Sequence, residues 1–443
     1  MVSRGFEATA QGSACGPDTR EESLTYSLAP SRLAGVVRLS GAKNSALRLL
    51  AASLLTSDPI VLHEFPHELL DAKVHLGMLE ALGKRWQKSG TSLAITEIDD
   101  RPTSLQWEGR SIRNTLLILG ALTARRGRGS VPSPGGCDLG ERRYDLHEMV
   151  LRELGALVTD DGARLSAEHG GRRLRGGEIN LPIRSTGATE NAILCGVLAE
   201  GSTRIWNPHV RPEILDLIAM LRRMGARIRV FGQEHIAIEG VAELHGAEHS
   251  VLPDNMEALA WLIGAVVTDG DVEIARFPFE HLEVPLVHLR ESGARFFRGS
   301  DTLIVRGGRP FPLEIATGAY PGINSDMQPL LATYGAFATG RSKVIDLRFP
   351  GRYRYAEELQ RLGIDARVES NLLTIDGRGR AVIRGATVSA TDLRAGIALT
   401  LAGWGASDGT TVIADAWQVE RGHDRFAEKA QALGASIVRS SNP

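Results

Sequence analysis

A short phrase that recurs six times along the chain constrains its fold more than any other feature of the sequence. The phrase is a leucine or alanine, three further residues and a glycine, and its glycines are separated by 72, 70, 68, 70 and 71 residues. Six nearly equal periods in a chain of 443 residues indicate six copies of one structural unit. The six glycines are Gly83, Gly155, Gly225, Gly293, Gly363 and Gly434.

The residues around these glycines predict the elements of one unit. A glycine after an amphipathic segment is typical of the left-handed residue that ends a helix. Short alternating runs follow, such as 226–230 and 235–238, and they predict paired strands. A second phrase, an acidic residue and a glycine, ends another helix and opens a strand at 200–205, 269–274 and 408–413. Each unit is therefore predicted to be a β–α–β–α–β–β module, with three modules in each globular domain.

Composition limits the classes of protein to which the chain can belong. The net charge is −2, so no overall field attracts nucleic acid or a membrane surface. The sequence holds no run of about 18 apolar residues of the kind that spans a bilayer. Cys15, Cys137 and Cys195 are too few for a disulfide framework, which favours a reducing, cytoplasmic location. Residues 1–24 are polar and lack the apolar core of a signal peptide, so we expect a disordered extension there.

The segment 134–142 is the strongest local indication of chemistry. It is a glycine-bounded loop with one thiol, Cys137, and an arginine, Arg142, five residues further on. A thiolate near cations has a lowered pKa and becomes usable as an acid or a nucleophile. Taken alone, the same residues also describe a flexible turn with an inert cysteine. Cys195 lies in the apolar run 192–198 and is interpreted as a core residue.

Four motifs resemble those of the enolpyruvyl transferase family. They are a Lys–Asn pair within 40–44, the thiol loop running on to 145–147, an acidic motif at 325–328, and arginine motifs at 392–396 and 420–423. The likeness covers the chain from about residue 27 to its end. The thiol loop and the Lys–Asn pair resemble the branch that acts on UDP-N-acetylglucosamine and not the shikimate-pathway enzyme.

The resemblance implies an α/β fold of two domains, each an inside-out α/β barrel built from three modules of about 70 residues. The two domains of this family are joined by a double crossover. One domain is therefore expected to comprise 25–42 together with 252–443, and the other 43–251, which carries the Cys137 loop. The active site is expected in the cleft between them, a common place for a ligand to be enclosed.

Enolpyruvyl transfer requires a strongly cationic site. The methylene carbon of phosphoenolpyruvate (PEP) is protonated, an acceptor hydroxyl adds to the adjacent carbon, and phosphate leaves. A substrate with a phosphate and a carboxylate needs several fixed cations, and the planar fork of arginine suits both groups. By resemblance, the PEP-binding residues are Lys43, Arg113, Arg142, Arg352, Arg394 and Arg421.

The resemblance also assigns catalytic roles to Lys43, Cys137, Asp326 and Arg421. Cys137 is expected to donate the proton to the methylene carbon and to be alkylated by the epoxide fosfomycin. Asp326 either takes the proton of the acceptor hydroxyl or orients that hydroxyl while another group acts as the base. An alternative for Asp326 is a helix N-cap, because Ser-Asp before an apolar run is a common cap. No metal and no cofactor is expected.

The acceptor is expected to be a uridine nucleotide. The segment 185–189 resembles the family's Ser-Val-Gly-Ala-Thr loop, where backbone amides and a hydroxyl can meet a diphosphate or ribose. Residues 145–146 match the pair that contacts uracil, although Asp145 is also a candidate N-cap. Asn44 is expected to hydrogen-bond the acceptor or the adduct, and it also stands at a helix start. The expected nucleotide-binding residues are Asn44, Arg143, Asp145, Leu146, Ser185, Thr186 and Gly187.

The chain departs from the family's usual sequence around the acceptor. Phe-Glu-Asn-Arg becomes Phe-Pro-Gly-Arg at 349–352, and Arg-Pro-Val-Asp becomes Arg-Arg-Tyr-Asp at 142–145. Because the PEP-binding cations and the thiol are kept, this pattern predicts the same half-reaction on a different acceptor. Arg143 is expected to face a terminal phosphate monoester.

These changes resemble the enolpyruvyl transferases of nikkomycin- and polyoxin-type nucleoside antibiotic biosynthesis, which use UMP. The 3′-hydroxyl of UMP is therefore expected as the acceptor, in preference to the 3-hydroxyl of UDP-N-acetylglucosamine in peptidoglycan precursor synthesis. A non-catalytic nucleotide-binding paralogue is the rival interpretation, and the complete set Lys43, Cys137, Asp326 and Arg421 argues against it. The expected partners are PEP and a uridine nucleotide, without nucleic acid or membrane.

Overall fold

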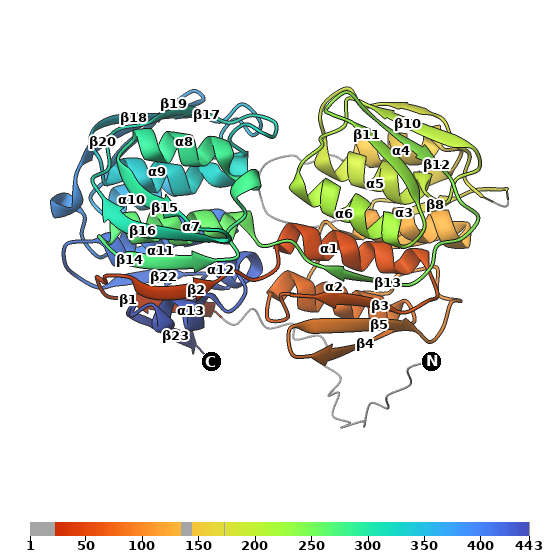
Figure 1. The fold of residues 1–443 in the computed structure, drawn as a ribbon, viewed down its shortest axis with the longest axis horizontal. Helices are drawn as coiled ribbons and strands as arrows, with labels where there is room; N and C mark the ends of the chain where they lie inside the picture. The colour runs from red at the N-terminus through yellow and green to blue at the C-terminus, as the bar shows by residue number, and fades with distance from the viewer. Residues whose placement is uncertain (1–22, 134–143, 172, 443) are drawn as a thin grey trace.

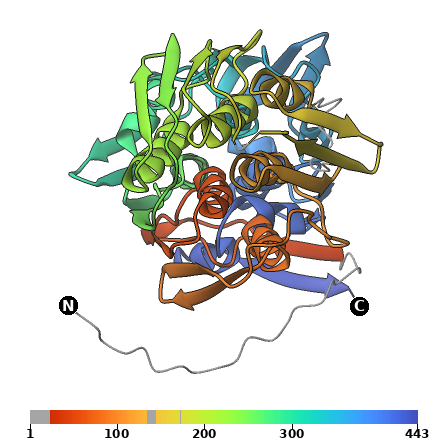
Figure 2. The same cartoon turned by 90° about the vertical axis from the view of Figure 1, so that its right-hand side faces the viewer.

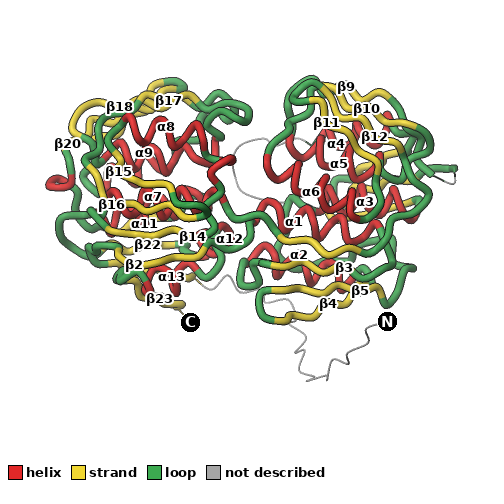
Figure 3. Tube along the Cα trace, in the orientation of Figure 1, coloured by secondary structure: helices red, strands yellow, loops and turns green. Residues whose placement is uncertain are grey.

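The computed structural model describes residues 23–133, 144–171 and 173–442. Their strands form six small sheets, which are distributed over two lobes that lie side by side (Figure 1). Within each lobe the helices lie inside and the strands lie outside (Figure 3). Figure 2 faces one lobe and shows the same arrangement, with helices at the centre and strands around them. The expected two-domain α/β fold with sheets outside and helices inside is therefore confirmed.

One pairing pattern is common to the sheets. A short edge strand runs parallel to an inner strand, and that inner strand pairs antiparallel with the next, which pairs antiparallel with the last. In the three-stranded sheet the edge strand is reduced to a parallel bridge between Ser104 and Ser130. The parallel pair needs a crossover helix and the antiparallel pair a tight turn, which together give the predicted β–α–β–α–β–β order.

In the lobe that contains the C-terminus, the sheets in strand order are β15 (Ala294–Arg298), β16 (Thr302–Gly308), β14 (Asp271–Ala275) and β2 (Ala34–Arg38); β17 (Glu314–Ala316), β18 (Thr339–Ile345), β20 (Leu372–Arg378) and β19 (Asp365–Glu369); and β21 (Thr387–Ser389), β22 (Thr411–Ala414), β1 (Ser23–Leu28) and β23 (Ile437–Asn442).

In the other lobe they are β13 (Ala247–Ser250), β3 (Ile60–His63), β5 (Ser92–Glu97) and β4 (Lys84–Ser89); β6 (Arg128–Pro132), β8 (Arg164–Glu168) and β7 (Leu157–Asp160); and β11 (Arg227–Phe231), β12 (His235–Glu239), β10 (Ser202–Trp206) and β9 (Glu178–Asn180).

Three helices fill the centre of each lobe. In the lobe with the C-terminus these are α7 (Asn255–Val267), α9 (Gln328–Ala336) and α11 (Leu393–Gly405), which contact one another and are buried at every residue. A helix that is apolar on all sides is stable only when it is surrounded by protein. The corresponding helices of the other lobe are α1 (Lys43–Ala52), α3 (Thr115–Arg126) and α5 (Thr186–Gly196).

The second helix of each module is buried on one face only and ends at one of the six recurring glycines. All six of these glycines have positive φ, between 81° and 101°, as the helix-ending role requires. These helices are α2 (Leu70–Ala81), α4 (Asp145–Glu153), α6 (Pro212–Arg223), α8 (Glu283–Glu291), α10 (Tyr355–Arg361) and α13 (Phe426–Ala432). Shorter helices are α12 (Trp417–Gly422), η1 (Ser53–Leu55), η2 (Phe279–His281), η3 (Ser325–Met327) and η4 (Arg380–Val382).

The chain crosses between the lobes twice, and the two crossing segments pair with each other. The first runs from β2 into α1 and the second from β13 into α7, and they meet in a bridge between Gly41 and Pro253. Ala42 N donates to Leu252 O at 2.7 Å, and Asp254 N donates to Ser40 O at 3.0 Å. The connection between the lobes is thus a pair of hydrogen-bonded strands and not a single flexible linker.

Two hydrophobic clusters correspond to the two lobes. One comprises buried residues from 24–39 and 256–437, and the other those from 46–251. We propose that these clusters are the two domains, with the limits 25–42 plus 252–443 and 43–251. The expected end of the extension at residue 24 is wrong, because β1 begins at Ser23 and Leu24 is a core residue paired with Ser441.

No helix among the described residues is long and apolar enough to cross a membrane.

Candidate active site

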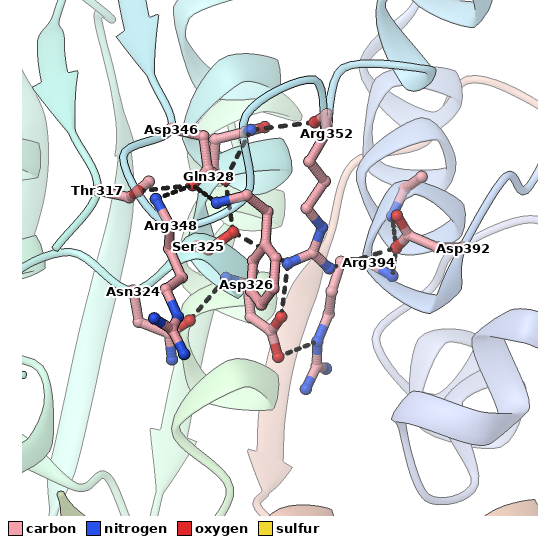
Figure 4. A network of polar contacts seen from close by, with 12 residues as sticks. Thr317, Asn324, Ser325, Asp326, Gln328, Asp346, Arg348, Arg352, Asp392 and Arg394 are labelled. Atoms are coloured by element: carbon pink, nitrogen blue, oxygen red, sulfur yellow. Dashed lines mark hydrogen bonds and ion pairs between the residues drawn. The ribbon is translucent and has the colours of Figure 1, made fainter. Parts of the chain in front are cut away.

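Asp326, Arg352 and Arg394 form an ionic cluster in one lobe (Figure 4). Arg352 Nη1 lies 2.8 Å from Asp326 Oδ1, and Arg394 Nε lies 3.4 Å from Asp326 Oδ2. Burial opposes ionisation of Asp326, but the charges of Arg352 and Arg394 and the hydrogen bond from Arg352 hold its pKa far below the usual range. Asp326 is therefore an ionised carboxylate held between two buried guanidinium groups.

Local caps place this cluster. The side chain of Asn324 accepts a hydrogen bond from Asp326 N at 2.6 Å and begins η3, so the carboxylate of Asp326 is not used as a cap. The N-cap alternative for Asp326 is therefore wrong. Asp392 caps α11 by accepting from Arg394 N at 2.7 Å, and it also lies 3.7 Å from Arg352 Nη2. This cap holds Arg394 in the first turn, where its side chain reaches Asp326.

The two arginines of the cluster retain donors for a further anion. Arg352 Nε and Arg394 Nη1 are buried and have no hydrogen-bond partner among the described residues. A buried guanidinium nitrogen is rarely left in this state, because the loss of water is otherwise uncompensated. A carboxylate or phosphate oxygen is the natural partner for such donors. The cluster can therefore bind an anionic group beside Asp326.

Lys43, Asp71 and Arg421 form a second ionic cluster, which joins the two lobes. Lys43 Nζ lies 2.7 Å from Asp71 Oδ2, and Arg421 Nε lies 2.9 Å from Asp71 Oδ1. All three side chains are less than 10% exposed. Burial opposes ionisation of Asp71, but Lys43 and then Arg421 hold its pKa below the usual range.

The two clusters are neighbours. A Cβ added to Gly422, the residue after Arg421, would lie 3.5 Å from Arg394 Nη1. The unpartnered donor of the first cluster therefore points toward the helix that supplies the second. One region between the lobes is thus surrounded by four cations, which are Arg352, Arg394, Arg421 and Lys43. This arrangement meets the need of a substrate that carries two anionic groups.

The predicted nucleotide-binding segments also come together. Ser185 caps α5 by accepting from Ala188 N at 3.4 Å, so the segment 185–187 forms the amino end of that helix. A Cβ added to Gly187 would lie 2.8 Å from the Nε2 atom of His147, which belongs to the first turn of α4. The segments 145–146 and 185–187 are therefore adjacent, as a shared ligand requires.

The N-cap alternative for Asp145 is wrong. Asp145 is the first residue of α4 and is exposed, while Tyr144 occupies the cap position without a side-chain cap. Leu146 is half-buried beside it. The Asp145 carboxylate is thus accessible at the amino end of a helix.

Arg113 and Asn44 lie at the starts of inner helices. Arg113 is half-buried just before α3. The pKa of His147 is lowered to about 3, mainly by burial and in addition by the positive charge of Arg113. Asn44 is the second residue of α1, and its half-buried side chain makes no hydrogen bond to the described residues. Both lie where the sequence places site residues, and the helix-start interpretation of Asn44 is confirmed.

Three predicted site residues, Cys137, Arg142 and Arg143, lie outside the described residues. Cys195 is fully buried in α5 and donates to Gly120 O at 3.6 Å. Burial raises the pKa of the Cys195 thiol to about 12, so it is not a reactive thiolate. Its interpretation as a core residue is confirmed.

Comparison with known proteins identifies the family. The model of the family of EPSP synthase (3-phosphoshikimate 1-carboxyvinyltransferase) matches residues 28–430. The chain belongs to this enolpyruvyl transferase family. It is an enzyme of the 1-carboxyvinyl transferase class.

Relatives of known sequence and structure cover nearly the whole of this enolpyruvyl transferase. It is 40% identical to UDP-N-acetylglucosamine 1-carboxyvinyltransferase 2 of Carboxydothermus hydrogenoformans, over 93% of this chain and 98% of that protein. It is 41% identical to UDP-N-acetylglucosamine 1-carboxyvinyltransferase of Gloeobacter violaceus, over 92% of this chain and 88% of that protein. The crystal structure of the enolpyruvyl transferase NikO from Streptomyces tendae superposes with a TM-score of 0.86 at 25% identity, over 95% of this chain and 100% of that chain.

The sequence interpretation missed charged residues that the transferase fold brings to the site. Asp71 gives no signal beyond an acidic residue in the first turn of a helix, which is common. Arg211 binds Glu213, with Nε 2.9 Å from Oε2, at the start of α6. Burial lowers the pKa of Arg211, but the negative charges of Glu213 and, next, Asp326 raise it above its ordinary value. Arg211 is therefore an electrostatic neighbour of the Asp326 cluster and comes from the other lobe.

Proposed function

We propose that this transferase moves the enolpyruvyl group of PEP to the 3-hydroxyl of UDP-N-acetylglucosamine and releases phosphate. The supporting observation is the 36–41% identity, over 92–93% of the chain, to enzymes named for that acceptor. The two aspartate-centred clusters add a cationic site of the kind that PEP needs. The order of acceptors expected from the sequence, with UMP first, is therefore reversed.

UMP remains the second candidate acceptor. The observation that favours it is the replaced segment 349–352, in which an exposed Pro350 and Gly351 lead to the buried Arg352. A site that lacks polar partners for the amino sugar loses discrimination in its favour. The structural likeness to NikO is compatible with either acceptor, because it concerns the transferase fold as a whole.

In the proposed reaction, the cations of both clusters hold PEP between the lobes. Arg352 and Arg394 each offer one donor that has no partner in the part of the chain that the structure describes, and Lys43 and Arg421 are positioned by Asp71. Cys137 protonates the methylene carbon of PEP, and the acceptor hydroxyl loses its proton and bonds to the adjacent carbon. In the resulting tetrahedral adduct the new methyl group loses a proton as the C–O bond to phosphate breaks, which restores the double bond in the enolpyruvyl product. Fixed cations stabilise the negative charge that collects on the departing phosphate.

Asp326 acts on the acceptor hydroxyl. Its low pKa without substrate keeps it ionised, so that it can accept a hydrogen bond, but makes it a weak base. An anion bound to Arg352 and Arg394 would offset their charges and raise the pKa of Asp326. We therefore expect Asp326 to orient the hydroxyl first and to become a stronger base only when PEP is bound.

A phosphate-release assay with PEP and each acceptor in turn tests the function. Release with UDP-N-acetylglucosamine, and little with UMP or shikimate 3-phosphate, is the expected result. Release with UMP alone would place the second candidate first. No release with any of the three, from a protein that is folded by circular dichroism, would contradict both proposals.

A further inference from the structure

His209 connects the two lobes through both nitrogens of its ring. It lies between β10 and α6 in one lobe, and its Nδ1 is 2.9 Å from Thr186 Oγ1 at the start of α5. Its Nε2 lies 3.2 Å from the backbone nitrogen of Tyr320 in the other lobe. One side chain therefore contacts the predicted nucleotide loop and a loop of the opposite lobe.

These two contacts fix the tautomer of His209. The Tyr320 backbone N–H is a donor, so Nε2 of His209 must be an unprotonated acceptor. A neutral imidazole then carries its proton on Nδ1, which donates to Thr186 Oγ1. Thr186 makes no other side-chain hydrogen bond to the described residues, so its own hydroxyl proton is left to donate elsewhere.

His209 is held firmly within its own lobe. Its backbone nitrogen donates to Thr189 Oγ1 at 3.1 Å, and Thr189 in turn donates to Ser185 O at 2.7 Å. The next residue, Val210, is held through its backbone nitrogen, which donates to Gln233 Oε1 at 3.2 Å. The imidazole is thus fixed relative to the amino end of α5 before the other lobe is considered.

The partner loop leads directly to Asp326. Tyr320 belongs to the connection between β17 and η3, and Asp326 lies six residues after it. Hydrogen bonds from Gly318 N to Ile323 O at 2.7 Å and from Gly322 N to Ala319 O at 2.9 Å close this connection into a compact loop. Asn324 then links the loop to the backbone of Asp326. A contact that holds Tyr320 therefore also restrains the position of Asp326, because a short, internally hydrogen-bonded segment joins the two residues.

We propose that His209 is a positioning residue with two roles: it orients the Thr186 hydroxyl as a donor to an oxygen of the acceptor nucleotide, and it holds the Tyr320 loop so that Asp326 faces that acceptor. The ligand class is an anionic nucleotide with a phosphate or ribose oxygen at Thr186. This inference rests on the proposed function, because it assigns the nucleotide to the amino end of α5.

The surroundings of His209 keep it neutral. Burial lowers the pKa of His209 to about 4, with Arg211, Arg348 and Arg184 acting in the same direction and Glu213 opposing them. Burial and three neighbouring arginines thus outweigh one carboxylate and disfavour the imidazolium near neutral pH. Nε2 of His209 therefore stays unprotonated near neutral pH and can accept the hydrogen bond from the Tyr320 backbone N–H.

Two substitutions separate the two contacts. H209N keeps an amide donor near the Nδ1 position and loses the acceptor for Tyr320, while H209Q keeps an acceptor near Nε2 and loses the donor to Thr186. We expect H209N to lower kcat about 5- to 10-fold with the acceptor KM nearly unchanged. We expect H209Q and T186V each to raise the acceptor KM about 5- to 10-fold with kcat nearly unchanged. The double variant T186V/H209Q should lose no more than either single variant.

The same two substitutions at His245, whose side chain is 62% exposed in the connection between β12 and β13, are the matched controls and should have wild-type kinetics. Equal kinetic effects of H209N and H209Q, or additive effects of T186V and H209Q, would overturn the proposal. A melting temperature for each variant excludes a general loss of folding as the cause.

A spectroscopic measurement tests His209 without turnover. Spectra of the protein with 15N-labelled histidine, assigned by the signal lost in H209N, should show the Nδ1–H tautomer unchanged from about pH 8 to about pH 5.5. An Nε2–H tautomer, or protonation near the ordinary histidine value of about 6.5, would overturn the proposal. If no acceptor is turned over, the proposed function fails, while this spectrum still decides the state of His209.

Discussion

The two aspartate-centred clusters of the site have the same pattern of charges and different origins in the chain. Each places one carboxylate between two cations, but Asp326, Arg352 and Arg394 all belong to the lobe with the C-terminus. In the second cluster, Lys43 and Asp71 come from the opposite side of the double crossover to Arg421. The first cluster can form when one lobe folds, whereas the second forms only when both lobes are in place.

Exposure separates the two carboxylates further. The side chain of Asp326 is 29% exposed, while that of Asp71 is only 4% exposed. A carboxylate that reaches solvent can meet a substrate hydroxyl, whereas one that is almost fully buried cannot. We therefore propose that Asp326 acts on the substrate and that Asp71 holds the lobes and their cations in position.

The largest loss of activity is expected on replacing Cys137, because neither cluster can take over the role of its thiol. Both clusters supply charge, but neither includes a thiol to protonate carbon, so Cys137→Ala should lower kcat about 100- to 10,000-fold, the range of a lost general acid. Cys137→Asp should recover part of the rate, because a carboxylic acid also donates a proton. Steady-state phosphate release measures both.

Alkylation by fosfomycin gives an independent measurement of the same thiol. Mass spectrometry should find the adduct on Cys137 and none on Cys195, which is buried and has a pKa of about 12. Full activity in Cys137→Ala, or an adduct only at Cys15, would contradict the assignment.

The next effect concerns the cations of the cluster that joins the lobes. Lys43→Ala and Arg421→Ala should each lower kcat/KM for PEP by at least about 100-fold, because a charge-assisted contact in a closed site contributes on the order of 3 kcal/mol. Arg341, which is 60% exposed and paired with Asp376, provides the control, and Arg341→Ala should be nearly neutral. Near-wild-type kinetics in both cluster variants would place PEP elsewhere.

Replacing each aspartate by asparagine tests the comparison most directly. Asp326→Asn should lower kcat by about 100-fold or less, with little change in the KM for PEP, because the group acts on the acceptor. Asp71→Asn should instead raise the KM for PEP about tenfold, because Lys43 and Arg421 lose the group that positions them. Steady-state kinetics with each substrate varied separates the two results. The same kinetic pattern in both variants would remove the distinction between the clusters.

The sequence predicted repeating structure better than it predicted ionic partners. The six glycines could be predicted to end helices because a positive φ is a local requirement that few other residues meet. The arginine positions followed from motifs that resemble those of the family. Asp71 could not be found in this way, because its role arises only when α2 meets α12, and these elements lie about 350 residues apart.

The two N-cap alternatives that proved wrong also depended on contacts that a local pattern does not contain. Asp326 and Asp145 both fit a local capping pattern, but Asn324 takes the cap in the first case, and Tyr144 occupies the N-cap position of α4 without a side-chain cap in the second. His209 belongs to no motif quoted above, since the role that we propose for it depends on Thr186 and Tyr320 from separate modules. Local chemistry can be predicted from sequence, whereas contacts between modules require the fold.

The smallest expected effect is a change in the pH dependence of stability. The pKa of Asp71 is depressed in the folded protein, so its contribution to the free energy of unfolding is complete above the ordinary aspartate value of about 4 and is lost as the pH falls through the lower folded-state value. Asp71→Asn should therefore be less stable than wild type at pH 7, and the difference should shrink on acidification below about pH 4.

The pKa of Asp376 is also depressed, by hydrogen bonding to Arg341, but that pair lies at the surface. Salt should thus weaken the effect of Asp376→Asn while leaving that of Asp71→Asn nearly unchanged, because buried pairs are screened much less. Denaturant unfolding of the three proteins between about pH 3 and 7, at low and high salt, measures both effects. An equal response of the two variants to salt would mean that Asp71 is exposed to solvent in the free enzyme, and that the cluster joining the lobes forms only when substrate binds.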